Sequence, residues 1–211
     1  MEIFKSILSF ISAMFIGVFG FINPVIKIAP TPTLPLSIGN TSVSPLIPTT
    51  NEFNSKPVDR GDVIGIMGNT GNASRPKLHF AVYNLNESDL NKFNADVGHL
   101  NPFNFLRNKK LFFDSDSCHD VSKKIEKSVG TGNWDWPMSN PIISQCYGNT
   151  QLSLNNPDEI NNGIDMYDDV DTLVRAVENG NKYVYRGGAS EGNGVLIFHS
   201  DGKMSLYWHL Q

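Results

Sequence analysis

The sequence GDVIGIMGNTG at residues 61–71, followed by KLHFAVY at residues 77–83, decides the fold class of this chain. Each piece contains a short run of β-branched, aliphatic or aromatic residues, and a glycine-rich turn separates the two runs. No helical pattern follows these glycines, which excludes a phosphate-cradling loop and leaves them as turn and close-packing positions. The segment therefore predicts two short strands joined through a tight turn.

A second set of short strands is predicted between residue 134 and residue 211. Turn sequences separate them, with ENG at residues 178–180 and SDG at residues 200–202. The predicted strands cover residues 141–145, 173–177, 182–185, 195–198 and 204–208. Short strands at close spacing with turn residues between them predict an all-β fold with a mainly antiparallel sheet.

Residues 1–27 predict an export signal that forms a hydrophobic helix. Lys5 precedes an apolar run from Ile7 to Ile22 that has no polar face, and Asn23 and Pro24 end it. No small-x-small cleavage motif follows, so a cleaved signal peptide and a retained inner-membrane anchor both remain open. We therefore expect an exported protein, located in the periplasm or another extracytoplasmic compartment.

The remaining chain divides into four parts by composition. Residues 28–57 form a linker rich in Pro, Thr and Ser, and residues 58–106 contain the first β block. Residues 107–133 are interpreted as a connector, and residues 134–211 contain the second β block. A net charge of −4 and a pI near 5.7 give no electrostatic basis for binding nucleic acid.

The chain has two cysteines, Cys118 and Cys146, and their state is open from sequence alone. In an oxidising compartment they are able to form a disulfide worth roughly 3 kcal/mol, whereas two free buried thiols are the alternative. Their spacing does not match a metal-binding or redox motif.

Five residues have the type and spacing of a metal site or its surroundings. Alternate residues of a strand share one side, so Asn161 and Asp165 are expected on one face, and Lys77 and His79 on another such face. His209 is the fifth candidate. In contrast, His199 is interpreted as a structural hydrogen-bonding residue.

Taken together, these segments resemble the lysostaphin-type, or LytM-like, zinc endopeptidases that cut peptide cross-links of bacterial cell walls. Residues 61–71 and 77–80 are similar to the closing half of that family's domain. The opening half of that domain is marked by the motifs H-x-G-x-D and Y-x-H-L. Four segments of this chain are similar to it: NNGIDM (161–166), VRAVENG (174–180), GNGVLIFH (192–199) and SLYWHL (205–210). The resemblance implies a LytM-like β-sandwich.

Carried over residue by residue, the resemblance implies that Asp165 and His79 are zinc ligands and that His209 is a catalytic histidine. Asn161 and Lys77 stand where the family has histidines. An Asn amide is a poor zinc donor and an ammonium group repels a metal, so zinc binding is expected to be weak or lost. The expected function is a peptidoglycan-directed metallopeptidase relative, a weakened or inactive endopeptidase; the alternative is a non-catalytic peptidoglycan-binding or amidase-regulating module.

The order of the two halves is reversed relative to the family pattern. A circular permutation, a truncated tandem of domains, and complementation between two copies of the chain each account for this order. Peptidoglycan is the expected partner of the chain, and a wall amidase or a second copy of the chain is the further expected partner.

Trp134, Trp136 and Tyr147 are open to two interpretations. They form either a platform on which sugars stack or an anchor in the core.

Overall fold

The computed structural model describes residues 55–114, 118, 125–148 and 160–211. The predicted N-terminal helix and nearly all of the linker lie outside these residues. The chain divides into two units, residues 1–41 and 42–211, and every described residue belongs to the second. Within the described ranges, no helix has the length and apolar character needed to cross a membrane.

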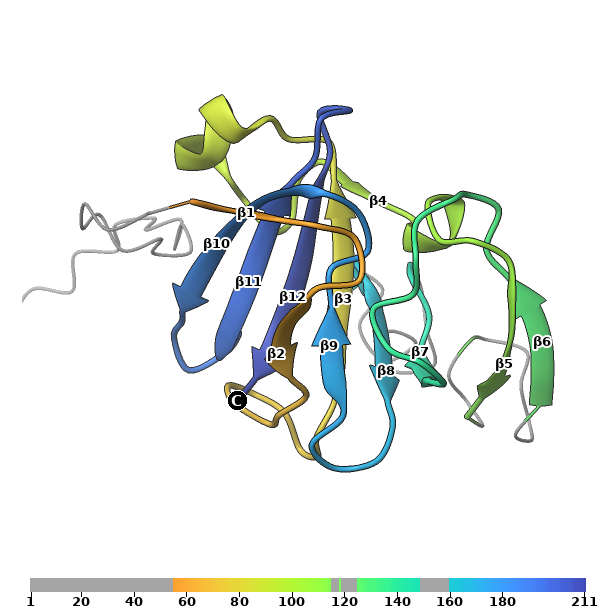
Figure 1. Cartoon of the computed structure of the whole chain (residues 1–211). Helices are drawn as coiled ribbons and strands as arrows, with labels where there is room; N and C mark the ends of the chain where they lie inside the picture. The colour runs from red at the N-terminus through yellow and green to blue at the C-terminus, as the bar shows by residue number, and fades with distance from the viewer. Residues whose placement is uncertain (1–54, 115–117, 119–124, 149–159) are drawn as a thin grey trace, which may run out of the picture. The chain divides into compact units, whose positions relative to one another are not determined.

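The described residues form a mainly antiparallel β fold, which confirms the predicted all-β class (Figure 1). Ten strands of the described part make one sheet in the order β1-β10-β11-β12-β3-β8-β7-β5-β6, with β4 paired to β3. Strands β2 and β9 form a separate pair, and the one parallel pairing among these strands joins β5 to β7. The strands are β1 Lys56–Val58, β2 Val63–Ile66, β3 Leu78–Tyr83, β4 His99–Leu100, β5 Lys109–Phe113, β6 Ile125–Val129, β7 Ile142–Gln145, β8 Ile164–Tyr167, β9 Leu173–Arg175, β10 Gly180–Arg186, β11 Asn193–Phe198 and β12 Met204–Leu210, and two 3-10 helices are η1 Glu87–Lys92 and η2 Pro102–Asn104.

Strand β3 from the first β block lies between β12 and β8, which both come from the second block (Figure 1). The small sheet has the same mixed origin, because β2 belongs to the first block and β9 to the second. The two blocks therefore build one fold together, although the connector separates them in sequence.

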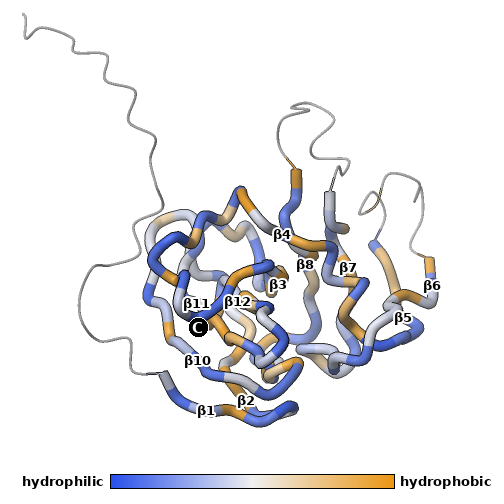
Figure 2. Tube along the Cα trace, turned by 90° about the horizontal axis from the view of Figure 1, so that it is seen from above, coloured by the Kyte–Doolittle hydropathy of each residue, from blue (hydrophilic) through white to orange (hydrophobic). Residues whose placement is uncertain are grey.

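Strand β3 is buried along its whole length, which explains why its sequence reads as an almost continuous apolar run. Leu78, Phe80 and Val82 pack into the larger core cluster on one face of the sheet, whereas Ala81 and Tyr83 pack into a second cluster on the other face. Residues of the 85–95 segment, which includes η1, pack against the second cluster. Figure 2 shows the trace by hydropathy, with hydrophilic stretches along many of the connections between strands.

Part of the expected connector is strand. Strands β5 and β6 lie within residues 107–133 and pair as an antiparallel hairpin at one end of the main sheet. Strand β6 has no buried residue, and a surface ion pair joins Lys110 to Glu126 across the hairpin. A strand at the end of a sheet carries polar residues on both faces, so its sequence lacks the alternation that identifies a half-buried strand.

Two of the open sequence questions are answered by the fold. Cys118 and Cys146 form a disulfide, with their Cα atoms 5.3 Å apart. Trp134 and Trp136 are 4% and 6% exposed and belong to the large core cluster, so they anchor the core and offer no sugar platform. Tyr147 packs at the edge of the same cluster and its hydroxyl contacts His99.

Candidate functional site

A row of six residues crosses the main sheet on one face, and we call it the site row. Each member lies directly opposite the next on a neighbouring strand, and directly opposed residues point to the same face of a sheet. The row consists of Tyr185 on β10, Gly194 on β11, Trp208 on β12, His79 on β3, Asp165 on β8 and Gln145 on β7. The sheet thus brings two predicted site residues, His79 and Asp165, into a direct cross-strand pair.

Asp165 is the electrostatic centre of the site and is 4% exposed. Its Oδ1 lies 2.7 Å from Nδ1 of His79, and its Oδ2 accepts a hydrogen bond from the Lys77 ammonium at 3.0 Å. Burial alone would raise the pKa of the Asp165 carboxyl, but the hydrogen bond and electrostatic interaction with His79, together with those of Lys77, lower it to about 2. The carboxylate is therefore ionised at neutral pH and occupied by two protein donors.

His79 is held in a fixed orientation on both sides of its ring. An ionised carboxylate only accepts hydrogen bonds, so Nδ1 carries the proton donated to Asp165. Nε2 is buried and has no hydrogen-bond partner in the described structure. It points toward Gly163, because a Cβ built on that glycine would lie 2.8 Å from Nε2. Nε2 of His79 is therefore covered by the backbone at Gly163 in this structure.

The indole of Trp208 extends the site along the row. Its ring stacks on His79 with centroids 5.6 Å apart and an interplanar angle of 24°. On its other side the indole leans over Gly194, where an added Cβ would lie 2.6 Å from Cδ1. Trp208 is half-buried, so part of the ring faces solvent.

His209 adopts a left-handed backbone conformation, with φ of 67°, which is rare for a residue with a side chain. The turn around Thr70 supports it: the Thr70 carbonyl lies 2.8 Å from Nδ1 of His209, and the Thr70 hydroxyl donates to the Leu210 carbonyl at 2.6 Å. Burial lowers the pKa of His209, and Lys77 and His79 also lower it, against the raising effects of the Thr70 hydrogen bond and Asp165. The ring is neutral at pH 7, and its centroid lies 6.5 Å from that of His79.

The fifth predicted residue, Asn161, is engaged elsewhere. Its side-chain amide donates to the Cys146 carbonyl at 3.0 Å, and its backbone forms two hydrogen bonds with Gly148, at 2.7 and 3.0 Å. The structure therefore brings Lys77, His79, Asp165 and His209 together, whereas the Asn161 side chain supports the segment that carries the disulfide.

The residues present do not fit a catalytic zinc ion. Such an ion takes three protein ligands and a water molecule. Asp165 and His79 are the available donors, and the Lys77 ammonium lies against the carboxylate. No group of three His, Cys, Asp or Glu side chains in the described residues is placed to hold a metal ion.

Sequence reasoning identified Lys77 and Asp165 separately but missed the bond between them. The available signal was that Lys77 and Asp165 carry opposite charges and were both assigned to the same site. Reasoning from sequence also missed Trp208, although it directly precedes His209 in a quoted motif. Period two assigns Trp208 and His209 to opposite faces, yet both rings lie near His79. Trp208 is its direct cross-strand partner, whereas His209 lies at a left-handed backbone position.

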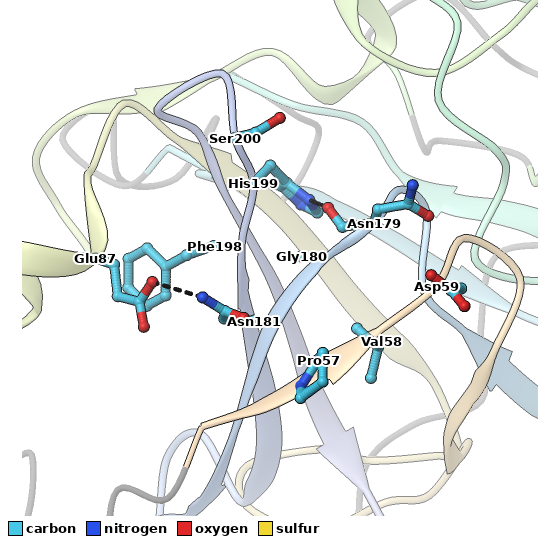
Figure 3. A pocket seen from close by; sticks show the side chains of 10 residues that line it. All are labelled: Pro57, Val58, Asp59, Glu87, Asn179, Gly180, Asn181, Phe198, His199 and Ser200. Carbon is cyan, nitrogen blue, oxygen red and sulfur yellow. Dashed lines mark hydrogen bonds between the residues drawn. The ribbon is translucent and has the colours of Figure 1, made fainter.

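A second feature, a hollow of about 390 Å³, has no residue in common with the site row (Figure 3). Asp59 and Glu87 are its charged lining residues, and Glu87 accepts hydrogen bonds from Asn181 at 2.9 Å and from Tyr183. His199 also lines it, and its ring contacts the Asn179 carbonyl and the Ser205 hydroxyl, both at 2.8 Å. His199 thus has the structural hydrogen-bonding role expected from the sequence.

Comparison of the chain with protein-family models, with curated proteins and with solved structures gave no match. Its function is therefore inferred from the site and from the sequence motifs.

Proposed function

We propose that this protein is exported to the cell envelope and binds peptidoglycan through a lysostaphin-type domain with a LytM-like β-sandwich whose hydrolytic site is inactive or strongly weakened. One observation carries the loss of hydrolysis: the Lys77 ammonium lies 3.0 Å from Oδ2 of Asp165, one of the two residues that the family resemblance assigns to zinc. A cation already bound to the carboxylate opposes metal binding there.

The site row supports binding in the absence of hydrolysis. Tyr185 and Trp208 are half-buried aromatic residues on one face of the sheet. Half-exposed aromatic rings combine an apolar surface with a polar tip, which suits ligands that mix sugar rings and peptide groups. Peptidoglycan has this mixed chemistry.

Cosedimentation with purified peptidoglycan sacculi tests this proposal. The full-length chain, kept in mild detergent because residues 7–22 are apolar, is expected to sediment with sacculi and to release no soluble fragments. Trp208→Ala is expected to weaken binding by about tenfold, the loss of one well-placed aromatic contact. Val184→Ala serves as the matched control, because Val184 is 59% exposed and lies outside the site row. Failure of the wild-type chain to bind sacculi would overturn the proposal.

A zinc-dependent endopeptidase is the second candidate, and the proximity of His79, Asp165 and His209 favours it. The measurement is the release of new amino groups from sacculi by the full-length chain, with and without added zinc. Zinc-dependent release that Asp165→Asn abolishes would establish this candidate and contradict the inactive site. If no amino groups are released, with or without zinc, two other partners are tested next. A wall amidase is tested by measuring its activation, and a second copy of this chain by measuring the oligomeric state.

A further inference from the structure

The carboxylate of Asp165 needs a positive charge because it is almost fully removed from water. Its side chain is 6% exposed, and an ionised carboxylate at such a position is costly unless it is paired and hydrogen-bonded. His79 supplies a hydrogen bond to one of the carboxylate oxygens, Oδ1. The other oxygen, Oδ2, needs a second partner.

Lys77 is that partner, and it places an ammonium group against Oδ2. Among the described residues, the two ion-pair contacts of Asp165 are with Lys77 and His79. Arg75, two residues earlier, is turned to other partners: its guanidinium lies 3.5 Å from Asp114 and 4.3 Å from the centre of the Tyr167 ring. The Lys77 side chain is 23% exposed, so its ammonium retains partial access to water while it contacts the buried carboxylate.

The backbone holds Lys77 in place at the start of β3. Its N–H donates to the Gly68 carbonyl at 2.9 Å, which ties it to the glycine-rich turn. That turn packs directly against the end of β12, since a Cβ on Gly68 would lie 2.8 Å from the carbonyl oxygen of His209. The backbone of Lys77 is thus fixed by the glycine-rich turn, and that turn is fixed by the end of β12.

We propose that Lys77 is a built-in cation that takes the place of a metal ion at Asp165 and thereby holds the site row in position without metal. The contacts form one chain: Lys77 binds Asp165, Asp165 binds Nδ1 of His79, and the His79 ring stacks on Trp208. Lys77 is accordingly a positioning residue for the Trp208 indole. This inference deepens the proposed function at the same site, but it holds whether or not the ligand is peptidoglycan.

Thermal unfolding of the full-length chain in mild detergent tests the inference, with four variants. Lys77→Met removes the ammonium group and retains most of the length, and it is expected to lower Tm by roughly 10 °C, because it leaves one oxygen of a buried carboxylate without its charged partner. Lys77→Arg keeps the charge and is expected to recover most of that loss. Lys110→Met is the matched control, since Lys110 forms an ion pair with Glu126 at the surface and its side chain is 65% exposed.

The double variant Lys77→Met, Asp165→Asn separates the charge from the fold. Removing both charges is expected to restore much of the Tm lost in Lys77→Met, which a merely steric role of the lysine would not produce. For the wild-type chain, neither EDTA nor added zinc is expected to move Tm. A Lys77→Met variant as stable as wild type, a double variant no more stable than the single one, or a wild-type Tm that EDTA lowers or zinc raises would overturn the inference. Sacculus binding by the wild-type chain is measured separately from Tm. Loss of sacculus binding would contradict the proposed function, whereas the Tm values test only the role of Lys77.

Discussion

Asp165 illustrates how a single buried carboxylate determines the chemistry around it. Two donors from β3 and its leading residue reach its two oxygens, one to each. In the folded protein these donors stabilise the charged form more than burial disfavours it, so the pKa falls from its ordinary value of 3.8 to about 2. The unfolded chain binds a proton more readily, and the charged carboxylate therefore contributes to stability.

The first prediction concerns acid. A carboxyl whose pKa is lowered on folding contributes stability that is complete above pH 3.8 and lost as the pH falls toward about 2. The contribution is about 2 kcal/mol, from 1.36 kcal/mol for each pKa unit. Urea unfolding of wild type and Asp165→Asn at several pH values measures it. The difference between the two proteins is expected to shrink below pH 4, and a difference that stays constant down to pH 2 would contradict the assignment.

The second prediction concerns Gly163, which lies against His79. A Cβ at this position would be 2.5 Å from the Phe80 carbonyl oxygen and 2.8 Å from Nε2 of His79, and neither neighbour is the free end of a flexible side chain. Gly163→Ala is expected to lower the free energy of unfolding by about 2 to 3 kcal/mol. Gly188→Ala, where the nearest atom is a Glu191 carboxylate oxygen at 3.6 Å, is the control and should have almost no effect in the same urea titration. Equal effects of the two substitutions would refute the close packing at Gly163.

Among the residues, the sequence singled out four that lie together in the structure, but it also included Asn161 and did not show how the four are bonded. Period two correctly placed Lys77 near His79, and both contact Asp165. The bond partner of Asn161 was beyond prediction, because its contact with Cys146 depends on how the 146–148 segment folds back. Likewise, no local sequence pattern predicts the left-handed backbone conformation of His209.

Among the elements, the β5–β6 hairpin gains a covalent link to the sheet. Cys118 lies between these two strands in sequence, and Cys146 follows the last residue of β7 directly. The disulfide therefore closes a loop with a sequence separation of 28 residues.

The third prediction follows from that loop. Reduction is expected to lower the free energy of unfolding by about 3 to 4 kcal/mol, because the reduced unfolded chain gains the freedom that the closed loop lacks. Urea titrations with and without dithiothreitol measure the change. The Cys146→Ser variant is expected to have the same free energy of unfolding as reduced wild type, and dithiothreitol is expected to leave that value unchanged. A wild-type midpoint that reductant leaves unchanged would refute a stabilising role of the disulfide.

Strands β11 and β12 share a buried polar chain that the apolar pattern of their sequences conceals. His199 contacts the Ser205 hydroxyl at 2.8 Å, Ser205 donates to the Tyr207 hydroxyl at 3.1 Å, and the Val177 N–H donates to the same hydroxyl at 3.1 Å. Tyr207 is fully buried, and burial raises the pKa of its phenol.

The fourth prediction removes the centre of this chain. Tyr207→Phe leaves the Val177 N–H without its acceptor and removes one of the two hydrogen-bond partners of the Ser205 hydroxyl, and should lower the free energy of unfolding by about 1 to 3 kcal/mol. Tyr185→Phe is a suitable comparison, because Tyr185 is only half-buried and a lost contact there is replaced by water. Chemical denaturation distinguishes them, and a Tyr207→Phe variant as stable as Tyr185→Phe would argue against the network.

Strands with strong apolar content were predictable, whereas polar ones were not. The predicted runs at 78–83 and 195–198 coincide with or fall within β3 and β11, because buried strands are rich in β-branched and aromatic residues. Strand β6 was missed because its exposure and edge position, set by the tertiary fold, determine its polar composition. Strand β5 was also missed, although it lies inside the sheet and buries Leu111 and Phe113 in alternation with more exposed residues.

At the scale of the whole molecule, the two β blocks depend on each other. Strand β3 lies between β12 and β8, and both of its edges are unpaired without them. The pairing was beyond prediction from sequence, which left three explanations for the reversed order of the halves. Sheet order is a long-range property that local patterns do not encode.

The fifth prediction tests this dependence with a chain cut after Asp114. Neither fragment, residues 1–114 or 115–211, is expected to show cooperative unfolding alone, because each lacks strands that the other supplies. An equimolar mixture in detergent is expected to recover the β-type circular dichroism and the cooperative transition of the intact chain. Cooperative unfolding of either fragment by itself would show that the blocks are independent.

The central position of β3 has a consequence for how the protein is made. Synthesis proceeds from the N-terminus, so β3 leaves the ribosome well before β8 and β12, which begin at Ile164 and Met204. During that interval an apolar strand has neither neighbour and presents two unpaired edges to any other chain nearby. Productive folding must therefore wait for the last residues of the described chain, and holding chaperones that bind the nascent chain should improve its yield more than they improve that of a protein whose strands pair in the order of their synthesis.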